Sequence, residues 1–151
     1  MNYLLDTNIV LTYIRDTAQS RRLEEDLQLL SGQHNLIVSV VSIGELKSIA
    51  KQNKWGKQKI QRMLDVLDDF LIADINVEEV IEKYAAIDAY SQGKLDEKAP
   101  DFSSRNMGKN DLWIAATASL YNFELLTTDR DFDHLAKAYL KLRVIELAKY
   151  K

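Results

Sequence analysis

Four acidic residues stand where a parallel α/β sheet would bring them together. Asp6 follows the apolar run Asn2–Leu5, Glu45 comes just after a second, β-branched run, and Asp129 follows a later one. The carboxyl ends of parallel strands share one edge of a sheet. Asp111 opens a helix that precedes the last of these runs, and such a helix begins at that same edge. The spacing therefore predicts four carboxylates at the edge where open α/β folds bind ligands.

Carboxylates gathered in this way point to a bound cation. Two ionised carboxylates 4 Å apart repel each other by about 4 kcal/mol at an effective dielectric of 20, and a cation offsets that repulsion. The nearby polar side chains are oxygen-rich, such as Asn8 and Thr127, which favours Mg²⁺ or Mn²⁺. Such an ion activates water and stabilises charge on a phosphodiester during in-line displacement. The acids thus predict metal-dependent nuclease chemistry.

Each acid also has a purely structural explanation. The run Ser42-Ile-Gly-Glu45 matches a capping box, in which Glu45 would bind the amide of Ser42. Asp6 and Asp111 fit helix N-caps or first-turn acids, and Asp129 fits an Asx turn. These alternatives stay open at the level of the sequence.

The elements that must position the acids alternate between strand and helix. Strands are predicted at 2–5, 36–41, 71–75, 124–127 and 144–147. Helices are predicted at 9–14, 20–31, 43–53, 57–70, 77–90, 111–121 and 131–140, with a long loop over 92–108. This alternation is typical of a three-layer α/β fold, a doubly wound parallel sheet. Without repeats or low-complexity tracts, residues 1–151 are expected to form a single domain.

Composition excludes several other classes of protein. The 151 residues include no cysteine, which excludes Cys-ligated metal sites and thiol nucleophiles. They include only two histidines, which makes a Ser-His-Asp hydrolase a poor fit. The longest apolar stretch, Leu36–Ile43, is far short of the roughly 20 residues of a membrane helix. No secretory signal is evident, and we expect a cytoplasmic protein.

One stretch carries concentrated positive charge despite the net charge of −3. Six basic residues and no acid lie between Lys47 and Arg62. Lys47, Lys51 and Lys54 have helical spacing and are candidates for RNA phosphate contacts. The alternative is an ordinary solvated helix face.

Four segments together resemble the PIN domain, and more narrowly the VapC-type ribonuclease toxins of type II toxin–antitoxin modules. They are Leu4-Leu5-Asp6-Thr7-Asn8, Ser42-Ile-Gly-Glu45-Leu46, Asn110-Asp111-Leu-Trp-Ile-Ala-Ala-Thr117-Ala118 and Leu126-Thr-Thr-Asp129-Arg-Asp131-Phe132. The resemblance covers nearly the whole chain in order. It implies a PIN-like sheet of strand order 3-2-1-4-5 and a Mg²⁺- or Mn²⁺-dependent endoribonuclease that cleaves RNA.

The resemblance also implies roles for particular residues. Asp6, Glu45, Asp111 and Asp129 match the family's metal-binding catalytic acids, and Asn8 and Thr127 match its supporting polar residues. Asp131 competes with Asp129 for the fourth position, where Asp129 is favoured because it lies two residues after Thr127.

The same resemblance implies protein partners. These are a second copy of the chain, with Trp55 and Met63 as candidate surface or core residues, and a cognate antitoxin whose peptide segment crosses the active-site groove. The opposing hypothesis is a non-catalytic PIN-like scaffold that binds RNA or protein. A haloacid-dehalogenase-type phosphatase fits poorly, because Asn8 stands where that family requires a second aspartate.

Overall fold

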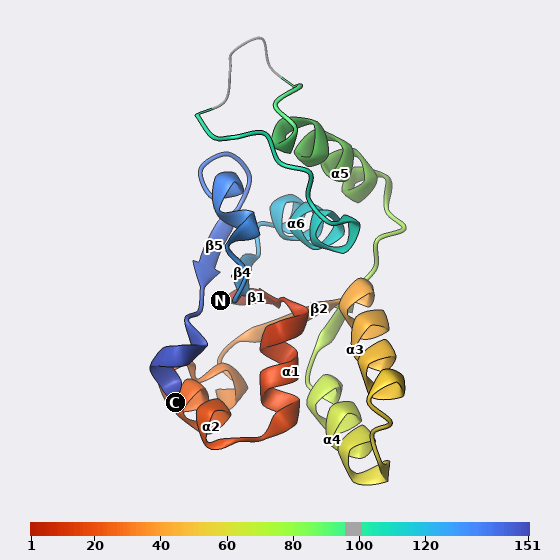
Figure 1. Cartoon of the computed structure of the whole chain (residues 1–151), viewed down its shortest axis with the longest axis vertical. Helices are drawn as coiled ribbons and strands as arrows, with labels where there is room; N and C mark the ends of the chain where they lie inside the picture. The colour runs from red at the N-terminus through yellow and green to blue at the C-terminus, as the bar shows by residue number, and fades with distance from the viewer. Residues whose placement is uncertain (96–100) are drawn as a thin grey trace.

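Five parallel strands form one sheet in the order β3-β2-β1-β4-β5, which confirms the predicted topology (Figure 1). The computed structural model describes residues 1–95 and 101–151. The strands are β1 (Asn2–Leu5), β2 (Asn35–Ser39), β3 (Leu71–Ala73), β4 (Glu124–Thr127) and β5 (Lys141–Val144). The α-helices are α1 (Thr7–Arg15), α2 (Ala18–Leu27), α3 (Val40–Gln52), α4 (Lys57–Asp68), α5 (Glu78–Ser91) and α6 (Lys109–Tyr121). The described residues also form three 3₁₀ helices: η1 (Leu29–Ser31), η2 (Arg130–Leu135) and η3 (Leu147–Tyr150).

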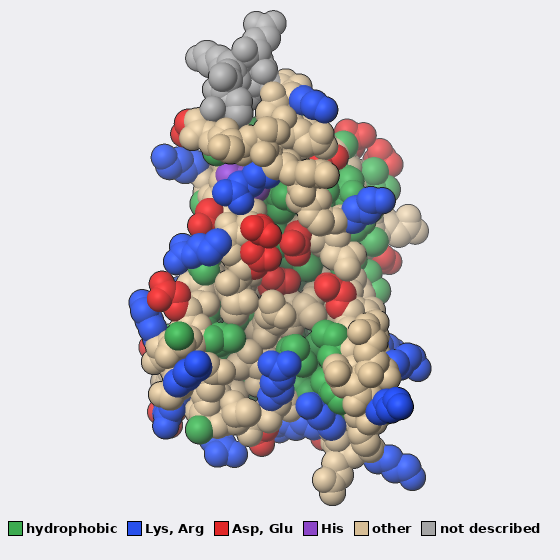
Figure 2. Space-filling view, in the orientation of Figure 1, with side chains coloured by type: hydrophobic (Ala, Val, Ile, Leu, Met, Phe, Trp, Pro, Cys, Tyr) green, Lys and Arg blue, Asp and Glu red, His purple; other side chains and the backbone are tan. Residues whose placement is uncertain are grey.

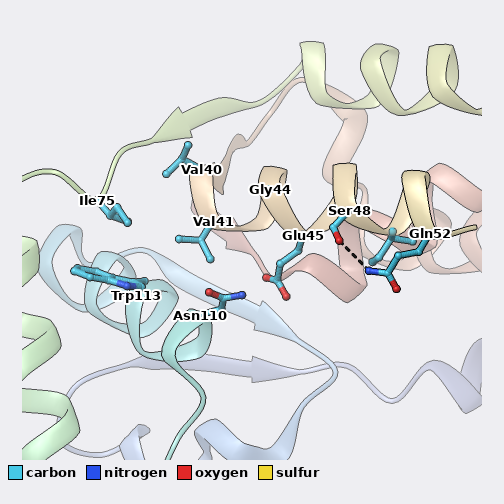
Figure 3. A pocket seen from close by; sticks show the side chains of 10 residues that line it. Val40, Val41, Gly44, Glu45, Ser48, Gln52, Ile75, Asn110 and Trp113 are labelled. Atoms are coloured by element: carbon cyan, nitrogen blue, oxygen red, sulfur yellow. Dashed lines mark hydrogen bonds between the residues drawn. The ribbon is translucent and has the colours of Figure 1, made fainter.

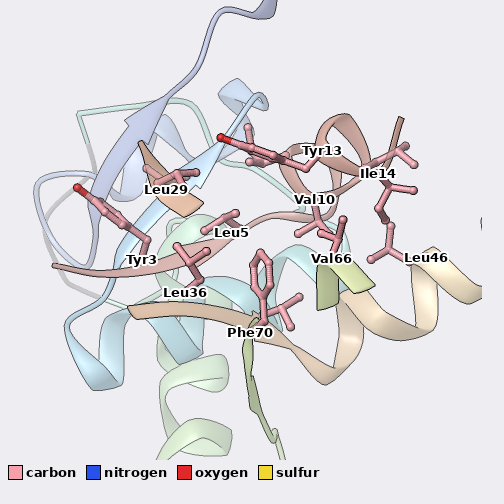
Figure 4. Close-up of a cluster of buried hydrophobic side chains, with 14 of the residues drawn as sticks. Tyr3, Leu5, Val10, Tyr13, Ile14, Leu29, Leu36, Leu46, Val66 and Phe70 are labelled. Atoms are coloured by element: carbon pink, nitrogen blue, oxygen red, sulfur yellow. The ribbon is translucent and has the colours of Figure 1, made fainter. Parts of the chain in front are cut away.

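The central strand β1 shows how the sheet separates two hydrophobic cores. Successive side chains of a strand point to opposite faces. Tyr3 and Leu5 belong to the core beneath α1, α3 and α4, which Figure 4 shows with Val66 and Phe70. Leu4 belongs to the opposite core, beneath α5 and α6. Helices therefore cover both faces, in three layers (Figure 1).

Strand register places the first two site residues side by side. β1 is paired with β2 on one side and with β4 on the other. Leu5 lies opposite Leu126, so Asp6 and Thr127 follow at the ends of adjacent strands. The amide of Asp6 donates to the carbonyl of Leu126 at 2.9 Å and so extends this pairing to the carboxyl edge.

Several predicted boundaries were wrong. The second strand ends at Ser39 instead of Val41, because the Ser39 hydroxyl caps α3 by accepting the amide of Val41 at 3.1 Å. The last strand is Lys141–Val144 instead of 144–147. The predicted helix 131–140 is the shorter η2, and the helix predicted at 20–31 ends at Leu27.

The predicted loop 92–108 is described only in part, since residues 96–100 lie outside the described residues. Residues 101–108 contain no helix or strand and lead into α6. Among the described helices, none is long and apolar enough to cross a membrane.

Candidate active site

Acidic side chains from four elements meet at the carboxyl edge of the sheet. Asp6 follows β1, Asp129 follows β4, Glu45 lies on α3, and Asp111 lies in the first turn of α6. Figure 2 shows acidic side chains gathered near the middle of one face, with basic side chains around them. The sheet topology thus produces the convergence expected from the sequence.

Asp6 is the most constrained of these acids, with only 6% of its surface exposed. Its Oδ1 accepts the amide of Thr7 at 2.8 Å, and its Oδ2 accepts the hydroxyl of Thr127 at 2.7 Å. Burial raises the pKa of Asp6, and these two hydrogen bonds oppose that rise. The carboxylate is therefore held in one orientation next to β4.

Thr127 connects Asp6 to the acids that follow β4. Its Oγ1 accepts the amide of Asp129 at 3.0 Å while donating to Asp6. Asp129 in turn accepts the amide of Asp131 at 2.8 Å, which is the predicted Asx turn. One hydrogen-bonded chain thus fixes Asp6, Thr127, Asp129 and Asp131 relative to one another.

A second network fixes Glu45. Its Oε1 accepts the hydroxyl of Thr7 at 2.8 Å, and that hydroxyl also lies 2.9 Å from the buried Ser42 Oγ. The capping box predicted for Ser42 and Glu45 is wrong, because α3 begins three residues earlier, after Ser39. Glu45 is instead tied to α1, the helix that Asp6 caps.

Three aspartates of the described chain bring carboxylate oxygens close together. Asp111, Asp129 and Asp131 each offer a carboxylate oxygen, and these oxygens lie within 4.8 Å of one another. Burial raises the pKa of Asp111 to about 7, with further contributions from the charges of Asp6, Asp129, Glu45 and Asp131. Asp129 and Asp131 both belong to this group, so the geometry does not choose between them.

The capping explanation holds for some of the acids and not for others. Asp6 caps α1 and Asp129 caps η2, as their alternative interpretation predicted. Asp111 is not the N-cap of α6, because Gly108 holds that position, but it lies in the first turn, where the helix dipole favours an acid, as the alternative interpretation predicted. The helix dipole accounts for an acid at this position but not for its placement beside the carboxylates of other elements.

The remaining predicted residues make other contacts. Asn8 donates from its side-chain amide to the hydroxyl of Thr128 at 3.4 Å. Lys47 and Lys51 line a hollow between α3 and α4 with Trp55 and Met63. Lys54 lines it as well, but α3 ends at Gln52, so Lys54 is not helical.

A hollow of about 570 Å³ adjoins Glu45 on the other side of α3. Figure 3 shows Glu45 and Asn110 facing each other across it, from α3 and α6, with Trp113 and Ile75 nearby. Sequence reasoning missed Asn110 and Trp113. The available signal was the three-residue spacing of Asn110 and Trp113 on the helix that carries Asp111, which puts the two side chains on one face.

The donor set fits a hard divalent cation. It consists of carboxylate and hydroxyl oxygens, the ligands that Mg²⁺ and Mn²⁺ prefer. Burial is the largest cause of the raised pKa of Asp111, and the charges of the neighbouring acids add to it, so a bound cation would favour its ionised form. Asp111, Asp129 and Asp131 have the geometry to share one ion, with Asp6 and Glu45 beside them.

A doubly wound sheet with acids at its carboxyl edge defines a class of α/β proteins that bind ligands there. Within that class, the sequence matches the PIN domain over residues 3–138, and the chain belongs to this family. No curated protein matches the chain.

Several solved structures from bacteria share the fold of this chain. The chain is similar to one in VapBC2 from Rickettsia felis bound to a fragment of its promoter DNA, with 22% identity, a TM-score of 0.77 and coverage of 97% of this chain and 100% of that one. It is similar to one in VapBC-1 from Haemophilus influenzae, with 24% identity, a TM-score of 0.70 and coverage of 95% and 98%. It is also similar to one in FitAcB from Neisseria gonorrhoeae, with 22% identity, a TM-score of 0.67 and coverage of 97% and 98%.

Proposed function

We propose that this chain is a Mg²⁺- or Mn²⁺-dependent endoribonuclease and the toxin of a type II toxin–antitoxin pair, acting as a single domain in the cytoplasm. The observation that carries the proposal is the convergence of Asp6, Glu45, Asp111 and Asp129 with Asp131 at the carboxyl edge of the sheet. Family membership and the similarity to chains of VapBC complexes support the toxin assignment.

In the proposed reaction, an ion held by Asp111, Asp129 and Asp131 would activate a water as nucleophile and offset charge on the phosphodiester. The residues of the chain would hold the ion and keep the surrounding carboxylates in position. Asp111, Asp129 and Asp131 would provide the ligand oxygens, and Thr127 holds the Asp6 carboxylate in position through its hydrogen bond. Thr7 does the same for Glu45. Both hydroxyls keep the carboxylates in position before substrate binds.

The direct test is cleavage of RNA by the purified chain, free of any antitoxin. We expect internal cuts in a labelled single-stranded or looped RNA when Mg²⁺ or Mn²⁺ is present. RNA binding without any cleavage, with no binding of divalent ions, would favour the non-catalytic scaffold instead.

The lysines of α3 give a separate prediction about RNA binding. Replacing Lys47, Lys51 and Lys54 together by Ala should weaken binding. If each contacts one phosphate, the slope of log affinity against log salt should also fall by about two. The matched control removes three lysines from the C-terminal part of the chain: Lys137, Lys141 and Lys151. Equal affinities and slopes for both triple variants would make the lysines an ordinary solvated surface.

We also propose that the protein forms a homodimer. Met63 is 3% exposed and belongs to the core, so it cannot be the predicted contact surface. Leu71 and Ile72, on the edge strand β3, are 64% and 61% exposed and are better candidates. Light scattering should give a dimer at micromolar concentration, and Ile72→Glu should give a monomer. Leu30→Glu, at a separate exposed position, is the control. A monomeric unmodified chain would contradict the prediction.

A further inference from the structure

The segment 101–108 is fastened to the end of α5, close to the acidic group. The amide of Arg105 donates to the carbonyl of Ser91 at 2.6 Å, and the hydroxyl of Ser104 donates to the carbonyl of Gln92 at 2.9 Å. Met107 is 8% exposed and belongs to the core beneath α5 and α6. The path of this segment is therefore set by packing and by main-chain hydrogen bonds.

The same segment is also packed against η2, the element that carries Asp131. The ring of Phe102 lies 5.0 Å from the rings of Tyr90 and His134, measured between centroids. His134 Nε2 lies 2.8 Å from the hydroxyl of the fully buried Ser91, which ties η2 to α5. These contacts hold Arg105 on the side of the acidic group formed by η2.

Arg105 is the basic residue that reaches this group. Its Nη1 lies 3.8 Å from Asp131 Oδ1. Among the described residues, this is the only ion pair in which a carboxylate of the site takes part. The five carboxylates of the site are those of Asp6, Glu45, Asp111, Asp129 and Asp131. This ion pair is long and consists of one contact, and the side chain of Arg105 is 43% exposed. A guanidinium has five N–H donors, so most of its donors remain available to a second anion.

From this geometry we propose that Arg105 binds a phosphate of the RNA strand beside the acidic group. The inference rests on the proposed ribonuclease function and adds a substrate-binding residue to it. An RNA strand must approach five carboxylates, which repel its phosphates. A guanidinium fixed next to them provides paired, planar hydrogen bonds of the kind that phosphate oxygens accept.

A nearby arginine offers a matched control. Arg130 begins η2 and pairs with Asp133 at 3.5 Å and with Glu146 at 3.4 Å, two acids outside the site. Its side chain is 65% exposed. Arg130→Ala removes the same charge from the same neighbourhood without removing the contact to Asp131.

The test compares Arg105→Ala, Arg105→Lys and Arg130→Ala with the unmodified chain. Arg105→Ala should lower kcat/KM for a single-stranded RNA about tenfold, mainly through KM, as expected for one charge-assisted phosphate contact. The slope of log(kcat/KM) against log salt should fall by about one. Arg105→Lys keeps the charge and should retain part of the activity, and Arg130→Ala should match the unmodified chain. Anisotropy of a fluorescent RNA, with Ca²⁺ in place of Mg²⁺, measures binding separately.

The outcomes separate this inference from the function on which it rests. If the unmodified chain cleaves RNA and Arg105→Ala cleaves it equally well with the same salt slope, the inference is wrong and the function stands. A faster Arg105→Ala variant would also overturn it, since the arginine would then be inhibitory. If the unmodified chain cleaves no RNA, the proposed function fails, and the binding measurement then decides whether Arg105 contacts a phosphate. Weaker binding by Arg105→Ala alone supports the phosphate contact, whereas equal binding, or no binding by any form, overturns it.

Discussion

Replacing Asp111 by Asn should abolish most RNA cleavage and leave the metal-free protein at least as stable as before. Asp111 lies among four other acids, and its pKa is raised to about 7 because burial and their charges disfavour its ionised form. Asn keeps the size of the side chain and removes this repulsion. Cleavage should fall by more than about a hundredfold, the upper range for losing a group that only supports a metal ligand.

The control for this variant is Asp133→Asn. Asp133 pairs with Arg130 on η2 and lies outside the acidic group, so its removal should leave cleavage unchanged. Melting temperatures in EDTA, with and without added Mg²⁺, complete the comparison. Asp111→Asn should melt no lower than the unmodified chain in EDTA and gain less from Mg²⁺. An Asp111→Asn variant that cleaves RNA at nearly the original rate would remove Asp111 from the site.

Removing divalent metal should abolish cleavage, and the affinity for metal should depend on pH. Asp111 must lose its proton to bind an ion, and its pKa in the folded, metal-free protein is about 7. Mg²⁺ or Mn²⁺ affinity should therefore rise as the pH increases to about 7 and level off above it. In Asp111→Asn this dependence should be much weaker.

The stability of the metal-free protein should change with pH in the opposite direction. Between the unfolded pKa of 3.8 and the folded value of about 7, the folded state binds more protons at Asp111 than the unfolded state does. The contribution of Asp111 to stability is thus complete below pH 3.8 and is lost as the pH rises through about 7. Saturating Mg²⁺ should reverse the trend.

Calorimetric metal titrations and denaturant unfolding across this pH range provide the measurements. The difference between the unmodified chain and Asp111→Asn isolates the effect of Asp111 from that of other groups. Cleavage that persists in EDTA would rule out the metal mechanism. Activity with Zn²⁺ alone would contradict the assignment of a hard, oxygen-ligated ion.

Sequence was sufficient for the features that depend on strand order and helix direction. The alternation of strand and helix predicted a parallel sheet, and a parallel sheet puts Asp6 and Asp129 at one edge. The position of Asp111 followed from the direction of α6, which runs antiparallel to the strands. These inferences needed only the order and type of the elements. Small errors in the predicted ends of the elements therefore did not change the predicted placement of the acids.

Element ends depended on contacts that no local pattern reveals. Val144–Leu147 is mostly apolar and begins with two β-branched residues, as a short strand does, but the strand ends at Val144 and the chain forms η3, where the carbonyl of Leu147 accepts a hydrogen bond from Gln19 of α2 at 2.8 Å. Val40 and Val41 look like strand residues because they are β-branched. The cap at Ser39 nevertheless starts α3 at Val40, and this shift removed the predicted capping box.

Contacts between segments that are distant in the chain could not be predicted from the sequence. His134 has no partner motif nearby, yet it meets Ser91, which lies 43 residues away. Arg105 stands in a segment without periodicity, and its pairing with Asp131 depends on the packing of Phe102 and Met107. Such pairs arise from tertiary structure alone.

The central position of β1 has a consequence for the order in which the protein is made. Asp6 and Glu45 leave the ribosome early, but β4, the strand that pairs with the other side of β1, begins at Glu124. A nascent chain that stops before this strand lacks Asp129 and Asp131 and leaves one side of β1 unpaired. For the proposed ribonuclease, which could attack the RNA of its own cell, the growing chain would thus lack a complete metal site until the residues that follow β4 have been synthesised.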